Sequence, residues 1–249
     1  MGVLNLVEKV RQTAIEQPEK VAYHFLGRDT SYGEFEQQVS LFASALQDLG
    51  VEKGDHVAFL LGNSPHFLIS LYASMRIGAT AIPVNPMYTP DEISYIIQNG
   101  DVKLVIALDQ LLPLVDLGVK AFPQVEHYII CETMPDIQEK LASLSNEAKA
   151  KIQLFSKLLS STTSKVEPIP LNDEDVAIIL YTSGTTGYPK GAMLTHRNIY
   201  SNARDVSEYL TINTNDRVIA TLPVFHVFAL TVVVNAPLLT GATVLLAPR

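Results

Sequence analysis

The chain has 249 residues, of which 47% are hydrophobic and 18% charged, and its formal net charge at pH 7 is −8. This acidic balance, without any run of Lys or Arg, argues against a general affinity for nucleic acid or anionic membranes. Cys131 is the single cysteine, so an intrachain disulfide is excluded and a reducing, cytoplasmic setting is expected. The N-terminal MGVLNLVEKVR carries charges where a secretory signal needs an apolar core, which argues against export.

In chain order, the first half repeats a helix, a glycine and an apolar strand. Ser31 and Glu34 form a capping box for a helix that we expect to end at Gly50 in the left-handed conformation. Thr89 and Glu92 form a second capping box, with a proline at the first helical position. Helices are predicted at 35–49, 65–77, 90–99 and 109–122, and strands at 56–61, 79–84, 102–107 and 125–130.

Strands that alternate with helices, each strand a continuous apolar run, predict a parallel sheet covered on both faces. Right-handed crossovers limit the topology to doubly wound forms, so the predicted class is α/β with doubly wound, mostly parallel sheets and helices on both faces. Residues 141–159 are typical of an amphipathic helix, and a polar connection with two prolines follows. We therefore expect a first α/β subdomain with its connecting segment at 1–170, and the start of a second at 171–249.

Residues 218–248 contain no Asp, Glu, Lys or Arg, and the segment is long enough to suggest a transmembrane helix. Pro223, Pro237 and Gly241 interrupt it, however. The run RVIAT (217–221) at its start and the run ATVLLA within it are short and rich in branched residues, as buried parallel strands are. We therefore expect hydrophobic core here and no integral membrane segment.

The sequence YTSGTTGYPKG (181–191) directly follows the predicted strand 175–181. Its glycines allow the backbone to adopt unusual conformations and to approach a ligand closely. Its hydroxyl groups and free backbone N–H groups make a concave site for an anion, and Lys190 adds a positive charge. A flexible surface turn is the alternative, but the density of hydroxyls after a buried strand favours a phosphate-binding loop.

The spacing excludes two common phosphate loops. A Walker loop requires G-x-x-x-x-G-K-[ST], whereas Gly184 and Gly187 are too close together and Gly191 follows the lysine. The Rossmann sequence G-x-G-x-x-G is absent. Because GAMLTH after the loop is typical of a strand, with a helix beginning near Arg197, the loop is predicted to join two strands.

The segment YTSGTTGYPKGAMLTHRN (181–198) resembles the signature loop of the adenylate-forming superfamily. That superfamily includes acyl-CoA synthetases, 4-coumarate-CoA ligases, luciferases and peptide-synthetase adenylation domains. RIGATAIPVNPMYTPDEISYIIQNGDVKLVI (76–106) resembles its N-terminal helix-strand stretch, and LPVFHVFAL (222–230) resembles its Pro-x-Phe-His element. The resemblance covers essentially the whole chain, is stronger to the fatty-acyl and coumarate branch, and implies the N-terminal part of an acetyl-CoA synthetase-like fold.

Members of this superfamily activate a carboxylate with ATP, form an acyl adenylate and pyrophosphate, and then transfer the acyl group to a thiol, usually that of CoA. Oriented dipoles, a lysine and Mg²⁺ stabilise the charge that develops on pyrophosphate. Lys190 is therefore a candidate catalytic residue, and the loop is also a candidate gate over ATP. The resemblance implies that the phosphates are held by Thr182, Ser183, Gly184, Thr185, Thr186, Gly187 and Lys190.

His226 is the second candidate catalytic residue. A lone histidine in a nearly uncharged segment is more often part of a core, but the Pro-x-Phe-His resemblance implies a place beside the carboxylate and the adenylate. We expect His226 to position the substrate and not to act as a general base. Phe228 and Ala229 are candidates for the acyl entrance, with core packing as the alternative.

Superfamily members are usually much longer than this chain. Their acidic Tyr-Gly-x-Thr-Glu-like motif, ribose-binding aspartate and C-terminal lysine are not found, so an N-terminal fragment is expected that is inactive alone. The main Mg²⁺ ligand is then expected beyond residue 249, and no metal ligand is assigned within the chain. The uncovered apolar C-terminal segment would favour self-association of such a fragment.

The leading hypothesis for the whole protein is a long-chain fatty-acid-CoA ligase, with the fatty acid, ATP and CoA as partners. A fatty-acyl substrate would allow a peripheral membrane contact. An aryl or coumarate-type CoA ligase and a carrier-protein-loading adenylation domain are the alternatives within the class. A non-catalytic nucleotide- or partner-binding module is the alternative from another class.

Overall fold

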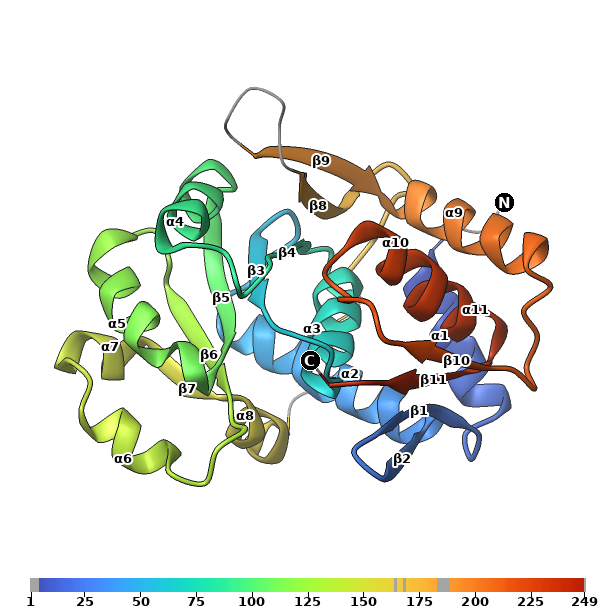
Figure 1. Cartoon of the computed structure of the whole chain (residues 1–249), viewed down its shortest axis with the longest axis horizontal. Coiled ribbons are helices and arrows are strands. Elements are labelled where there is room, and N and C mark those ends of the chain that lie inside the picture. Colours follow the sequence, from blue (N-terminus) through green and yellow to red (C-terminus); the bar gives the residue numbers. More distant parts are fainter. Residues whose placement is uncertain (1–4, 164, 168, 183–188, 249) are drawn as a thin grey trace.

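The computed structural model describes residues 5–163, 165–167, 169–182 and 189–248. Within them, two β-sheets flank a group of helices, and further helices cover the outer face of the larger sheet (Figure 1). The larger sheet has the order β7 (Ile152–Leu154), β6 (His127–Cys131), β5 (Val102–Leu108), β3 (His56–Leu60), β4 (Thr80–Pro83), β8 (Val176–Thr182), β9 (Lys190–Thr195). The smaller sheet has the order β10 (Arg217–Ala220), β11 (Thr243–Leu246), β1 (Val21–Phe25), β2 (Arg28–Ser31).

Helices separate β3, β4, β5 and β6 as the sequence predicts. In the first half they are α1 (Leu6–Glu16), α2 (Tyr32–Asp48), α3 (Pro65–Arg76), α4 (Pro90–Asn99), a 3₁₀ turn η1 (Asp109–Leu111) and α5 (Leu112–Ala121). In the second half they are α6 (Ile137–Ala142), α7 (Asn146–Lys151), α8 (Phe155–Ser161), α9 (His196–Tyr209), α10 (Val227–Ala229), a π-helix η2 (Leu230–Asn235) and α11 (Ala236–Thr240).

The strands from β7 to β8 pair in parallel, and β9 joins β8 in the antiparallel direction. In the smaller sheet β10, β11 and β1 are parallel, and β2 is antiparallel to β1. From β3 the chain passes first to β4 on one side and then to β5, β6 and β7 on the other. This order places a topological switch point between β3 and β5 and confirms the doubly wound, mostly parallel α/β class.

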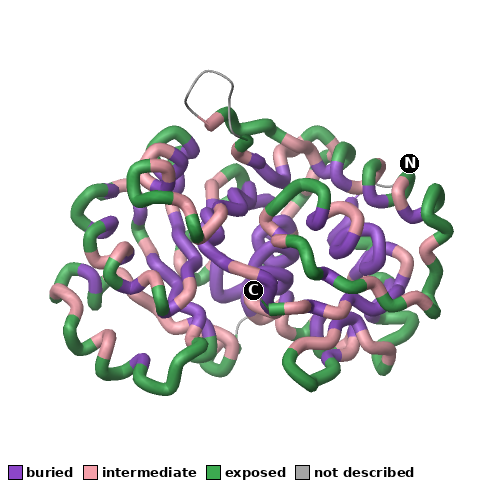
Figure 2. Tube along the Cα trace, in the orientation of Figure 1, coloured by how far each residue is buried: buried purple, intermediate pink, exposed green. Residues whose placement is uncertain are grey.

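Alternate residues of the larger sheet belong to two different cores, because side chains of a strand point to opposite faces in turn. Phe59 and Ile106 face the core that also contains α1, α2, α3 and α8, whereas Leu60 and Val105 face α4 and α5. The first core continues to Tyr23 and Val244 of the smaller sheet, so α2 and α3 lie between the sheets (Figure 1). Figure 2 shows this buried band through the middle of the molecule.

The predicted local signals are confirmed. Glu34 N–H donates to Ser31 Oγ at 3.2 Å, and the Glu34 carboxylate accepts from Ser31 N–H at 2.9 Å. The capping box of Thr89 and Glu92 is also complete. Gly50 follows α2 with φ +81°, the left-handed conformation that glycine adopts without steric cost.

The predicted helix at 141–159 is wrong, because α7, the short strand β7 and α8 replace it. β7 completes the edge of the sheet by pairing with β6, with Leu154 opposite Ile130. Such pairing supplies hydrogen bonds and burial that outweigh a local helical preference.

The predicted boundary at residue 170 does not separate the two sheets. β1, near the start of the chain, pairs with β11, near its end, and Tyr23 lies opposite Val244. β8, from beyond the boundary, pairs with β4, where Ala81 lies opposite Ile178. Each sheet therefore combines strands from both sides of residue 170. None of the helices in the described part of the chain combines the length and the apolar character that crossing a membrane requires.

Candidate functional site

The glycine- and hydroxyl-rich loop connects β8 to β9, as predicted. Its flanking residues Thr182 and Lys190 lie opposite each other in the antiparallel pair, and both are exposed. The strand-like GAMLTH forms β9, and α9 begins at His196 with a capping box between Thr195 and Asn198. The predicted loop residues outside the described residues are Ser183, Gly184, Thr185, Thr186 and Gly187.

A close contact at the end of the hairpin explains why glycine follows the lysine. A Cβ at Gly191 would lie 2.8 Å from Cγ2 of Ile179 and 3.2 Å from Cζ of Tyr181. The Tyr181 hydroxyl donates to Asn99 Oδ1 at 2.8 Å, which ties the start of the loop to the end of α4. Burial raises the pKa of Tyr181, with Tyr95 adding to the shift, so the hydroxyl stays protonated as a donor.

A cleft of about 230 Å³ lies at the carboxyl ends of β4 and β8. Its lining brings together the last residues of both strands, the turn after β4, and the segment before α10. The lining residues are Pro83, Asn85, Tyr88, Ile96, Leu180, Tyr181, Thr182, Phe225, His226 and Val227. The carboxyl ends of parallel strands are the usual place for a ligand in an open α/β sheet.

The structure brings some of the predicted site residues together and leaves others apart. Thr182 and His226 line the same cleft, although 44 positions separate them in the sequence. Lys190 lies at the mouth of the hairpin opposite Thr182, outside the cleft lining. Phe228 is 54% exposed, and Ala229 is fully buried in the core, so neither lines this cleft and core packing accounts for Ala229.

His226 begins α10 as its N-cap. Its Nδ1 accepts a hydrogen bond from the Phe228 N–H at 3.4 Å. A neutral imidazole with Nδ1 as the acceptor carries its proton on Nε2, which is then free to donate. The π-helix η2 follows α10 directly, and π-helical turns occur frequently at functional sites.

A second cavity, of about 590 Å³, lies beside the first and shares Leu180 and Val227 with it. Ile178, Leu194 and Leu230 give it apolar walls between β8, β9 and η2, and α9 contributes mainly polar side chains. The two cavities adjoin: the smaller one, beside Thr182, has a mixed lining with Asn85 and His226 among its polar side chains, and the larger one is partly apolar.

Asn63 is not among the residues predicted from the sequence; it is buried after β3 and bonds to the backbone of the segment that precedes His226. An asparagine between a strand and a helix is an ordinary turn residue, so nothing local marked it. Asn85 and Tyr88 were missed for the same reason, since they occupy the turn after β4.

The order of the larger sheet and the cleft at the ends of β4 and β8 define an α/β protein with a candidate ligand site at the carboxyl ends of parallel strands. The model of the AMP-binding enzyme family matches residues 10–249, and the chain belongs to this family. The expected membership of the adenylate-forming superfamily is thereby confirmed.

Relatives with assigned activities agree with this membership. The chain is 30% identical to a long-chain-fatty-acid-CoA ligase of Bacillus subtilis (strain 168), over 95% of this chain and 45% of the relative. It is also 30% identical to 4-coumarate-CoA ligase 4 of Arabidopsis thaliana, over 90% of this chain and 38% of the relative. The chain thus spans about half the length, or less, of these relatives.

A solved structure shows the same fold over nearly all of this chain. The inhibitor-bound N-terminal domain of FACL13 from Mycobacterium tuberculosis superposes with a TM-score of 0.83 at 28% identity. The match covers 98% of this chain and 57% of that one.

Proposed function

We propose that this chain supplies the phosphate loop and one wall of the carboxylate site of an ATP-dependent long-chain fatty-acid-CoA ligase. The observation that carries the proposal is the shared cleft, in which His226 and Thr182, the last residue of β8, lie together. A nucleotide on the loop and a carboxylate at His226 would then meet at the carboxyl ends of β4 and β8.

In the proposed first step, a carboxylate oxygen forms a bond to the α-phosphorus of ATP. The bond from that phosphorus to the bridging oxygen breaks, and pyrophosphate leaves with the electron pair. Lys190 and the hydroxyl of Thr182 stabilise the charge on the departing phosphates, together with the loop residues 183–187. His226 Nε2–H donates to a carboxylate oxygen and orients it, a positioning role that requires no proton transfer.

In the proposed second step, the thiol of CoA loses its proton to water and its sulfur forms a bond to the acyl carbon; the bond from that carbon to the phosphate oxygen breaks, and AMP leaves with the electron pair. When bound, Mg²⁺ would offset phosphate charge during the first step. The described residues contain no group of three or more His, Cys, Asp and Glu side chains placed to hold a cation.

The larger cavity supports an aliphatic substrate. It adjoins the cleft through Leu180 and Val227, so a carboxylate at His226 could extend an apolar chain between β8 and η2. An aryl or coumarate-type acid is the second candidate, because the 4-coumarate-CoA ligase is as similar in sequence as the fatty-acid ligase.

Titration calorimetry with ATP and Lys190→Ala tests the phosphate loop. Loss of a charged hydrogen-bonding group should weaken ATP binding by about ten-fold or more. The control Lys9→Ala removes an exposed lysine from α1 and should leave affinity unchanged. Equal affinities for the two variants would refute the assignment of Lys190.

Non-hydrolysable acyl adenylates, one with a hexadecanoyl group and one with a coumaroyl group, test the substrate class. Tighter binding of the hexadecanoyl compound supports the fatty-acid assignment, and preference for the coumaroyl compound overturns it. ATP–pyrophosphate exchange by residues 1–249 alone should stay at background, because the superfamily's later catalytic motifs are not in this sequence.

A further inference from the structure

The segment 220–226 carries His226 from the end of β10 to the start of α10. Apart from the β10–β11 ladder, its backbone makes three bonds to backbone groups: Ala247 N–H donates to Ala220 O at 3.2 Å, His226 N–H donates to Pro223 O at 3.0 Å, and Leu230 N–H donates to His226 O at 2.9 Å. The first bond leads to the end of β11, the second stays within the segment, and the third leads to the start of η2. None of the three connects the segment to the larger sheet, whose strands β4 and β8 line the rest of the cleft.

Asn63 makes that connection. Its side-chain amide donates both protons, to Ala220 O at 3.0 Å and to Leu222 O at 3.0 Å. Its Oδ1 accepts from Val224 N–H at 2.8 Å. The residue is only 4% exposed. One buried side chain therefore makes hydrogen bonds to every second residue of the segment, at 220, 222 and 224.

The location of Asn63 is informative. It follows β3 by three positions, at the switch point between β3 and β5, where open α/β sheets usually bind their ligands. Here the side chain at the switch point binds a distant segment of the same chain. The carboxyl end of β3 thereby supports the segment that lines the neighbouring cleft at the ends of β4 and β8.

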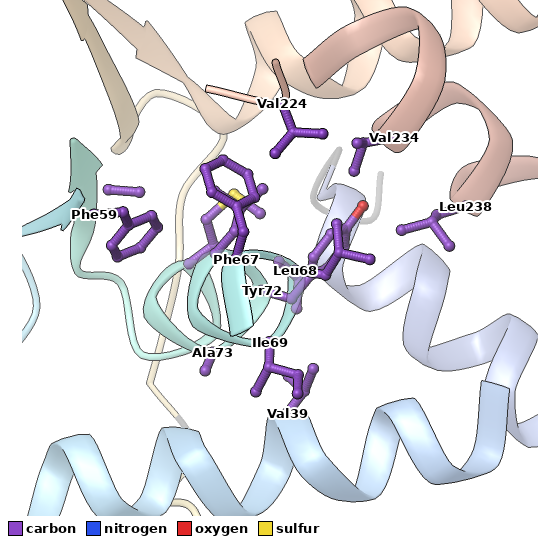
Figure 3. Packing of buried hydrophobic residues seen from close by; sticks show 14 of the residues in the cluster. Val39, Phe59, Phe67, Leu68, Ile69, Tyr72, Ala73, Val224, Val234 and Leu238 are labelled. Carbon is purple, nitrogen blue, oxygen red and sulfur yellow. The ribbon is translucent and has the colours of Figure 1, made fainter. Parts of the chain in front are cut away.

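The packing around the segment fixes its middle. Val224 is fully buried in the core that contains Phe67 and Leu68 of α3. Figure 3 shows Val224 on the same side of α3 as Phe67. The Val224 N–H thus lies in an apolar environment, where a donor without a partner is costly, and Asn63 satisfies it.

Few side chains can replace this pattern of two donors and one acceptor. Aspartate keeps an acceptor for Val224 but offers no proton to the two carbonyl groups. Leucine has a similar shape and makes none of the three bonds. The asparagine amide is thus matched to the groups that the segment presents.

We propose that Asn63 is a positioning residue: it anchors 220–224 to the larger sheet and so holds His226 at the cleft. The anchoring is independent of any ligand, whereas its effect on the carboxylate rests on the function proposed above. The two parts call for separate measurements.

The first measurement is amide hydrogen exchange in the 249-residue chain. Asn63→Leu should speed exchange at Val224 and His226 by about ten-fold or more relative to the sheet core. Asn63→Asp covers the case in which the leucine variant does not fold, and it should speed exchange at His226. The matched control is Asn5→Ala, since Asn5 is also buried and caps α1 through the Val7 N–H at 2.8 Å. It should leave exchange at 222–226 unchanged.

The second measurement is the affinity for a non-hydrolysable hexadecanoyl adenylate in a double-mutant cycle. Asn63→Asp and His226→Ala should each weaken binding, and the double variant should bind no worse than His226→Ala, because Asn63 acts through His226. Additive losses, or unchanged exchange at 222–226 in both Asn63 variants, would overturn the proposal. If the parent chain does not bind the adenylate, the proposed function fails, and the exchange data still decide whether Asn63 anchors the segment.

Discussion

Gly191→Ala is a sharp test of the packing beneath the phosphate loop. Gly191 is the second residue of β9 and lies opposite Tyr181 in β8. The added Cβ would lie 2.8 Å from Cγ2 of Ile179, whereas non-bonded carbon atoms prefer about 3.5–4.0 Å. The methyl of Ile179 or the strand β9 must therefore move by roughly 1 Å.

The magnitude follows from two opposing effects. Forcing an extra methyl into a packed contact costs about 1–3 kcal/mol. Replacing glycine by alanine within a strand stabilises the folded state by about 0.5–1 kcal/mol, because the unfolded chain then has less conformational freedom to lose. Since β9 is the edge strand of the described sheet and can relax outwards, we expect a net loss of about 1–2 kcal/mol. A chain of this length should then melt about 2–8 °C lower.

Urea and thermal unfolding measure this loss directly, and the double variant with Ile179→Ala tests its cause. Removing the Ile179 side chain removes the close contact, so Gly191→Ala should be nearly neutral in that background. A Gly191→Ala protein as stable as the parent, or an equal loss in both backgrounds, would refute the close-contact explanation.

Three further outcomes are expected in unfolding measurements. Gly118→Ala in α5 should stabilise the fold by about 0.5–1 kcal/mol, in contrast to Gly191→Ala, because its Cβ meets no atom closer than 3.4 Å and alanine favours a helix; a loss would contradict this. Burial lowers the pKa of His66 and of His196, so at acidic pH the unfolded state binds more protons than the folded state. As the pH falls below about 6.5, the free energy of unfolding should therefore decrease by up to about 1.4 kcal/mol per pH unit for each histidine. His66→Phe should flatten that slope between pH 7 and 5, and an unchanged slope would exclude His66 as a source. Asp109→Asn should lower the free energy of unfolding in urea by about 2–3 kcal/mol, because the buried carboxylate accepts three hydrogen bonds from the turn after β6. A decrease below about 0.5 kcal/mol would contradict this explanation.

Much of the fold could be predicted from short stretches of sequence. The capping boxes at Ser31 and Thr89 depend on residues three positions apart, and the structure contains both. The apolar runs that form β3, β5 and β6 are buried, as their composition indicates. These features depend on contacts within one turn or one strand, so neighbouring residues carry the information.

The candidate site could be predicted only in part. The hairpin that carries the loop follows from the strand-like sequences on either side of it, and the structure confirms β8 and β9. The resemblance of 222–230 to the Pro-x-Phe-His element predicts a substrate-positioning role for His226. No local pattern revealed that His226 and Thr182 line one cleft, because the two residues reach it from different elements.

The sequence alone thus determined the alternation of strands and helices, the position of the loop after a buried strand, and the family. Only the tertiary structure decided the pairing of β1 with β11, the edge strand β7 in place of a helix, and the bonds from Asn63 to 220–224. The physical reason is the separation along the chain over which each interaction acts. Propensities and caps act between near neighbours, whereas these pairings join backbone groups that meet only when the sheets have formed. Asn63 illustrates this difference, because its side chain forms hydrogen bonds with three backbone groups about 160 positions away in the sequence.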